Sequence, residues 1–214
     1  MQLPVIDASS KNEKIRVSDS LFASSVSETL LAQAIRVYLS NLRQGTAHTK
    51  TRSEINRTKK KWYKQKGTGN ARHGARTPSI FVGGGVAFGP RGISNWSKDL
   101  SSKSKLLALK SALSAQKANL FLSKDVSSLK GKVKEAKALL ANVGQSEDKI
   151  LVVLAKKTDL VFRSLRNVEN VLVMTVDRLN ALHVAMADKI VIDFTALKIL
   201  EDRLLKVKKT TLKK

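Results

Sequence analysis

The chain has 214 residues, 42% of them hydrophobic, and a formal net charge of +23 at pH 7. This length suffices for one sizeable core, but the charge exceeds what folding needs and indicates a polyanionic partner, either nucleic acid or anionic lipid. The absence of cysteine excludes disulfides, thiolate zinc sites and thiol nucleophiles.

Apolar patterns predict the first elements of the fold. Leu3 to Ile6 and Ile15 to Val17 have the character of short strands. From Val26 to Leu42, apolar residues recur at steps of three and four, which indicates an amphipathic helix behind a serine cluster. The same pattern predicts a second helix from Lys103 to Asn119.

From residue 120 onward, short apolar runs alternate with helix-like segments. The expected strands are Leu120 to Leu122, Ile150 to Ala155, Val171 to Val176 and Ile190 to Phe194. The expected helices are Lys132 to Asn142, Asp159 to Leu165, Asp177 to Leu182 and Thr195 to Leu205. This alternation predicts an α/β fold with a mainly parallel central sheet flanked by helices, Rossmann-like in topology but without a nucleotide site.

The segment from residue 43 to 98 differs in composition from its flanks. It carries 13 lysines and arginines against one acid, Glu54, and it holds nine of the eleven glycines. It shows neither helical nor strand periodicity, and so long a loop within a domain tends to be functional or disordered. We therefore predict a globular α/β domain at residues 1–42 and 99–206, an extended basic glycine-rich loop at 43–98 and a basic tail at 207–214.

Each residue type in this loop has a physical role in binding a folded RNA. Lysine and arginine neutralise phosphates and release counterions, aromatic rings stack on unpaired bases, and glycines let the backbone take up φ > 0. For Phe81 and Phe88, packing against the protein's own body is an equally good explanation. The predicted RNA-binding residues are Arg52, Arg57, Lys59, Lys60, Lys61, Trp62, Tyr63, Lys64, Gln65, Lys66, Gly67, Thr68, Gly69, Arg72, His73, Arg76 and Arg91.

The alternative function is that of an RNA-modifying or nucleotide-binding α/β enzyme. The only GxG, Gly67 to Gly69, follows a lysine-rich run rather than a strand, and Arg72 stands where a dinucleotide fingerprint needs its third glycine. The GGG at residues 83–85 indicates flexible or closely packed backbone rather than a phosphate cradle. No histidine has a companion at metal-ligand spacing. We therefore predict no catalytic residue, no metal and no cofactor.

A third class, a basic protein of the membrane surface, requires an amphipathic helix with lysines along one face. The basic loop has no helical period. The longest apolar run, Ile150 to Ala155, is too short to cross a bilayer, and the first thirty residues contain no apolar signal segment. We expect a soluble cytoplasmic protein with no membrane partner.

The run KQKGTGNARHGARTPSIFVGGGVAFGPRG, followed by LALKSALSAQ, resembles the bacterial-type family of large-subunit ribosomal protein L four. The resemblance is strong over residues 43–116 and extends to the α/β remainder through the order and length of its elements. It implies a structural, non-enzymatic protein of the cytoplasmic large ribosomal subunit, whose α/β body binds rRNA early in assembly. The implied partners are large-subunit rRNA, neighbouring large-subunit proteins including a second protein of the tunnel constriction, and the passing nascent peptide.

The same resemblance implies that the loop tip faces the nascent-peptide exit tunnel or the rRNA that lines it. The implied tunnel-facing residues are Lys64, Gln65, Lys66, Gly67, Thr68 and Gly69. Two positions depart from the arginine that is usual in the family. Lys64 keeps the charge but loses bidentate phosphate recognition, and Asn70 loses the cation, which puts the local rRNA contact in doubt.

Overall fold

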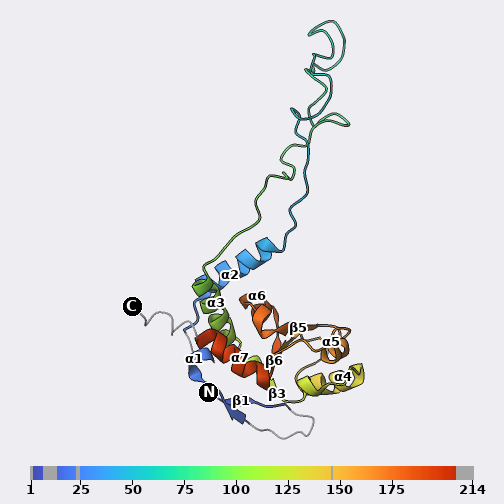
Figure 1. Ribbon diagram of the computed structural model, residues 1–214. Helices are drawn as coiled ribbons and strands as arrows, with labels where there is room; N and C mark the ends of the chain where they lie inside the picture. Colours follow the sequence, from blue (N-terminus) through green and yellow to red (C-terminus); the bar gives the residue numbers. More distant parts are fainter. Residues whose placement is uncertain (1, 7–13, 23–24, 146, 206–214) are drawn as a thin grey trace, which may run out of the picture. The chain divides into compact units, whose positions relative to one another are not determined.

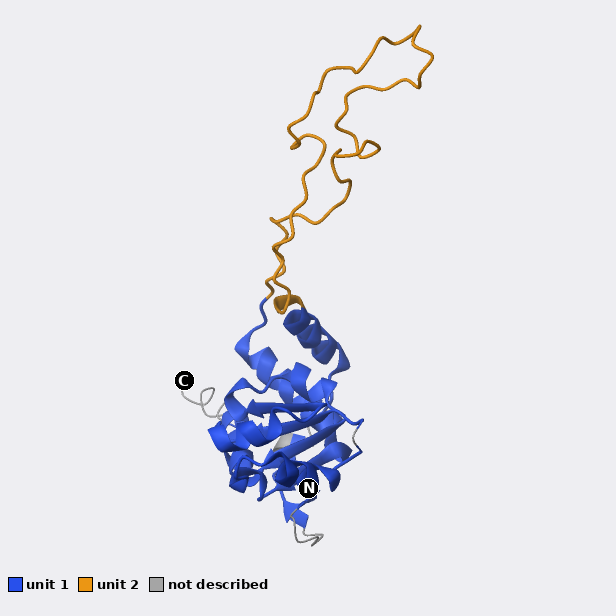
Figure 2. Cartoon of the chain, turned by 90° about the vertical axis from the view of Figure 1, so that its right-hand side faces the viewer, with its two compact units in different colours: residues 1–39, 99–214 blue, residues 40–98 orange. Residues whose placement is uncertain are grey.

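The computed structural model describes residues 2–6, 14–22, 25–145 and 147–205 (Figure 1). The basic tail predicted at residues 207–214 lies outside these described residues. The chain divides into two compact units, one of residues 1–39 and 99–214 and one of residues 40–98 (Figure 2). We call the first the α/β unit and the second the basic loop.

The elements predicted for the α/β unit occur in the predicted order, and a short helix at Asp19–Phe22 is present in addition to them. The strands are β1 (Gln2–Pro4), β2 (Lys14–Arg16), β3 (Leu120–Ser123), β4 (Ile150–Leu154), β5 (Val171–Thr175) and β6 (Lys189–Asp193). The α-helices are α1 (Asp19–Phe22), α2 (Glu28–Asn41), α3 (Ser102–Ala115), α4 (Val133–Ala141), α5 (Asp159–Leu165), α6 (Ala181–Met186) and α7 (Phe194–Leu205). Short 3-10 helices lie at Lys117–Asn119, Val126–Ser128 and Val176–Arg178.

Strands β3 to β6 form one parallel sheet in the order β3-β6-β4-β5, while β1 and β2 pair antiparallel in a separate ribbon. The predicted α/β fold with a parallel sheet is therefore confirmed. The last strand, β6, lies inside the sheet between β3 and β4. Strand β5 forms an edge, and its Leu172 is 45% exposed.

Each face of the sheet has its own hydrophobic core. Leu151 and Val153 of β4 belong to a core shared with α3, α6 and α7, whereas Ile150, Val152 and Leu154 belong to a core shared with α4 and α5 (Figure 1). This division follows from the two-residue period of a strand, which sends successive side chains to opposite faces. Because helices cover both faces, all five residues of β4 are buried.

The predicted start of the helix from Asp177 to Leu182 is wrong. The chain first forms the short 3-10 helix at Val176–Arg178, and α6 begins only at Ala181. Asn180 sets this boundary because its backbone is extended, at φ −134° and ψ 169°, and its Oδ1 accepts a hydrogen bond of 3.0 Å from the amide of His183. An asparagine in this position is an N-cap, which interrupts the helical pattern.

The helix predicted to reach Asn119 ends earlier. Helix α3 stops at Ala115, and the chain continues as a separate 3-10 turn before β3. Its start agrees with the predicted serine cluster, because the Oγ of Ser101 accepts a hydrogen bond of 3.2 Å from the amide of Ser104.

Candidate nucleic-acid interface

After α2 ends at Asn41, residues 42–98 of the basic loop form turns, bends and irregular backbone, with no helix or strand. This agrees with the absence of periodicity in the sequence. Hydrogen bonds join its two halves from Thr49 N to Pro90 O (2.9 Å), from Val86 N to Lys50 O (3.0 Å) and from Trp62 N to Gly74 O (3.0 Å). The two halves therefore run beside each other without forming a ladder.

Side chains tie the two ends of the basic loop together. The Nδ2 of Asn41 donates to the carbonyl of Lys98 (2.9 Å), whose amide donates back to the Oδ1 of Asn41 (2.8 Å). The hydroxyl of Ser40 donates to the carbonyl of Trp96 (2.6 Å). The Arg43 guanidinium lies over the Trp96 ring, 4.1 Å from its centroid, in a cation–π contact. One face of this indole is thus already occupied by the protein's own arginine.

Glu54 is the single acid of the basic loop, and its charge is neutralised within the loop. The Nη1 of Arg91 donates to both carboxylate oxygens, at 2.8 and 3.0 Å. The backbone amide of Thr51 donates to the same carboxylate at 2.8 Å. Arg91, one of the predicted RNA-binding residues, therefore contacts a carboxylate of its own chain.

These contacts lower the pKa of Glu54 from 4.5 to about 2, first through the Thr51 amide and then through Arg91. Because the pKa is lowered on folding, the stabilisation of the folded loop by this carboxylate is fully present above pH 4.5 and is lost as the pH falls through about 2.

We expect the Glu54 carboxyl carbon to titrate near pH 2 in ¹³C NMR. Arg91→Gln should raise the pKa only part of the way to 4.5, because the Thr51 amide still donates. A wild-type value near 4.5 would contradict the described geometry.

The GGG run is closely packed backbone rather than a phosphate cradle. A Cβ on Gly85 would lie 2.6 Å from the Cα of Arg52, across the two halves of the loop. The Gly85 amide donates to the carbonyl of Thr77 (2.9 Å), and the Nη1 of Arg57 donates to the carbonyl of Val82 (2.6 Å). Arg57, another predicted RNA-binding residue, therefore also holds the loop in its fold.

Gly85→Ala should separate the two halves of the loop at this crossing. The added methyl group would meet the backbone of Arg52, which cannot move aside as a flexible side chain can. The hydrogen bond from the Val86 amide to the Lys50 carbonyl is next to it, so we expect that amide to exchange faster in the variant. Gly92→Ala is the matched control, because the atoms nearest to its methyl group would be those of the His48 side chain, at an ordinary 3.5 Å. Equal exchange in the two variants would refute the close packing.

Four rings gather farther along the loop. Phe81 lies edge-on to Trp62, with ring centroids 5.3 Å apart, and to His73, with centroids 5.0 Å apart. Tyr63 lies 5.8 Å from Trp62, and the Arg76 guanidinium sits 4.8 Å from the centroid of the same indole. Phe81 thus packs against other residues of the basic loop. Trp62 nevertheless remains 47% exposed and can still receive a base.

The structure divides the predicted RNA-binding residues into two groups. The exposed ones are Arg52, Lys59, Lys60, Lys61, Trp62, Lys64, Gln65, Lys66, Gly67, Thr68, Gly69, Arg72 and Arg76. The partly buried ones, each with a partner in the loop, are Arg57, Tyr63, His73 and Arg91. The prediction omitted Arg43, whose contact with Trp96 spans 53 residues of sequence and leaves no local signal.

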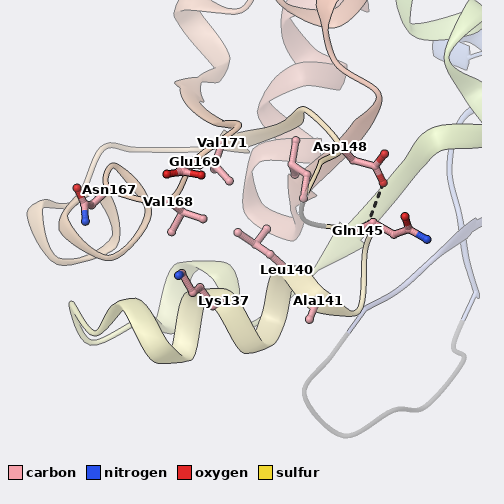
Figure 3. Close-up of a pocket in the computed structure, with 11 residues that line it drawn as sticks. Lys137, Leu140, Ala141, Gln145, Asp148, Asn167, Val168, Glu169 and Val171 are labelled. Atoms are coloured by element: carbon pink, nitrogen blue, oxygen red, sulfur yellow. Dashed lines mark hydrogen bonds between the residues drawn. The ribbon is translucent and has the colours of Figure 1, made fainter.

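The α/β unit contains a pocket of about 500 Å³ (Figure 3). Leu140 of α4 and Val168, just before β5, lie on facing walls (Figure 3). Ile150 and Val171, the first residues of β4 and β5, also line the pocket. Nucleotides bind parallel α/β sheets at the carboxyl ends of the strands, whereas this pocket lies at the amino ends. It therefore does not favour the nucleotide-binding alternative.

The residues that the structure describes contain no group of three or more acidic or histidine side chains that could hold a metal ion. None of their helices is long and apolar enough to cross a membrane.

The fold and the loop define a small α/β protein that carries one long, basic, glycine-rich insertion. A model of the Ribosomal protein L4/L1 family matches residues 15–203, and the chain belongs to this family. The chain is 39% identical to large ribosomal subunit protein uL4 of Aquifex aeolicus, over 83% of this chain and 90% of the relative. It is 36% identical to uL4 of Thermodesulfovibrio yellowstonii over 91% of both chains, and 34% identical to uL4 of Chlorobaculum parvum over 95% of this chain and 100% of the relative. The resemblance found in the motifs is confirmed.

Proposed function

We propose that this chain is a structural component of the large ribosomal subunit and that it binds large-subunit rRNA through the basic loop. The observation that carries the proposal is the charge of the loop: residues 55–98 contain no acid, and Arg91 neutralises Glu54. Family membership supports a structural role rather than an enzymatic one. No observation favours the RNA-modifying enzyme that the sequence left open.

The backbone of the loop supports the same function. Within the described residues, none of the amides from residue 63 to 76 donates a hydrogen bond. These donors and the exposed lysines beside them are suited to phosphate oxygens, which receive most hydrogen bonds from proteins that bind nucleic acids. The exposed part of the loop thus offers both charge and hydrogen bonds to an RNA backbone.

We propose further that residues 64–69 face the nascent-peptide exit tunnel or the rRNA lining it, beside a second protein of the constriction. Gly67 and Gly69 have φ values of +79° and +68°, and a Cβ on either would find no other atom within 4 Å. A tip whose two glycines have positive φ and open space around them is suited to a narrow space lined by another molecule. The family resemblance supports this position and a role of the α/β unit in early assembly.

The salt dependence of binding tests the electrostatic part of the proposal. Binding of the full chain to a large-subunit rRNA transcript should weaken linearly in log K against log salt. Neutralising about eight phosphates predicts a slope of about −6 to −7. A flat response would reject the proposal that the basic loop binds rRNA by neutralising phosphates.

A further inference from the structure

Phe88 differs from the other aromatic residues of the basic loop. Its side chain is fully exposed. Trp62, Tyr63 and Phe81 pack in the ring cluster, and Trp96 has a guanidinium over its ring. Phe88 is thus the one aromatic side chain of the described loop without a ring or cation against it.

The backbone at Phe88 is strained. Its φ is +53°, in the left-handed region that bulky side chains disfavour. Such a conformation persists only where the surroundings impose it, and strained residues cluster at functional sites. Here the flanking residues are fixed, because the Val86 amide donates to the carbonyl of Lys50 (3.0 Å) and the Pro90 carbonyl accepts from the amide of Thr49 (2.9 Å).

Gly89 completes this arrangement. A Cβ at Gly89 would overlap the Oγ1 of Thr49 and would lie 2.8 Å from the Cγ1 of Val86. The chain can therefore pass close to Thr49 only with a glycine at this position. The backbone between the two hydrogen bonds is thus held in a turn that places the ring of Phe88 in solvent.

The charge around this turn indicates which partner would cover the ring. The neighbouring segment carries Lys50 and Arg52, both exposed, and the one acid of the loop is paired with Arg91. The positive charge would not stabilise binding to an apolar pocket of a second protein. It would stabilise binding to an unpaired RNA base, because the ribose of that base is flanked by phosphates while the face of the base accepts an aromatic ring.

We propose that Phe88 is a base-stacking residue that lies against, or between, unpaired bases of the large-subunit rRNA. This inference rests on the proposed function, and it adds a contact at the return half of the loop, away from the lysine-rich run. The strained backbone presents the ring before RNA arrives, which lowers the conformational cost of binding.

The test uses the full chain and a large-subunit rRNA transcript. Phe88→Asn removes the ring but tolerates the left-handed backbone, Phe88→Trp keeps a stacking surface, and Phe88→Leu keeps only apolar bulk. Val82→Ala is the control, because Val82 is 96% exposed in the same half of the loop but has no ring. Stacking predicts that Phe88→Asn and Phe88→Leu bind the transcript about tenfold more weakly than the wild type. Phe88→Trp and the control Val82→Ala should bind as tightly as the wild type. No variant should change the slope of log K against log salt.

Three results would overturn the inference. Wild-type affinity of Phe88→Asn would show that the ring touches no base. Wild-type affinity of Phe88→Leu would show an apolar contact without stacking. Both would leave the salt slope of the wild type, and therefore the proposed function, intact. A wild type that shows no salt-dependent binding would instead remove the proposed function and this inference together.

Discussion

Replacing Lys59, Lys60, Lys61 and Lys64 together with alanine is expected to weaken binding to a large-subunit rRNA transcript by roughly 300-fold at about 0.15 M salt. All four side chains are exposed, and Lys61 is the one whose ammonium also donates a hydrogen bond within the described loop, to the Oε1 of Gln65. Each phosphate contact contributes about 0.7 to 0.9 to the slope of log K against log salt, so the loss of four should flatten the slope by about 3. Filter binding over a salt series measures both quantities.

The matched control removes the same charge from the α/β unit. Lys130, Lys132, Lys134 and Lys137 are also exposed, and they lie in and just before α4. We expect their replacement by alanine to change the slope by much less than 3, because local contacts rather than net charge determine counterion release. Equal losses in the two quadruple variants would mean that binding depends on total charge and not on the basic loop.

Leu151→Ala should lower the free energy of unfolding of the α/β unit by about 2 to 5 kcal/mol. Leu151 has no exposed surface, and it lies in β4, opposite Ile190 of β6 and Leu172 of β5. Truncation removes buried apolar surface and leaves a cavity between the sheet and its helices, which can close only in part. Urea unfolding followed by far-UV circular dichroism measures the change.

Leu172→Ala is the control for this measurement. The side chain has the same chemistry and lies next to Leu151 in the sheet, but β5 is an edge strand and Leu172 is 45% exposed. We expect a loss of about 1 kcal/mol or less. A comparable loss for the two leucines would contradict the assignment of β4 to the centre of the sheet and β5 to its edge.

Local sequence patterns were sufficient to predict most helices and strands of the fold but not the order of the strands in the sheet. The run ILVVLA predicted a strand covered on both faces, and β4 is buried throughout. The position of β6 between β3 and β4 depends on pairing between strands that are distant in sequence, such as Leu120 with Ile190. Apolar runs of similar composition do not specify which neighbour each will take.

The same limit applies to the candidate interface. Composition alone distinguishes the basic segment at residues 43–98 from its flanks. It could not show that Arg57 and Arg91 hold the loop together, because their partners, Val82 and Glu54, lie 25 and 37 residues away. The left-handed backbone conformation of Phe88 could not be predicted from the local sequence either, since it is imposed by hydrogen bonds to residues 49 and 50 on the other half of the loop.

Residues 59–74 bury too little apolar surface to offset the conformational entropy that they lose on ordering. The free energy that orders them must therefore come from contacts with a binding partner. Hydrogen exchange of residues 59–74, in the free protein and in its complex with the rRNA transcript, tests this most directly. We expect fast exchange in the free protein and strong protection in the complex. Strong protection before RNA is added, or none afterwards, would contradict the proposal that RNA orders this part of the basic loop.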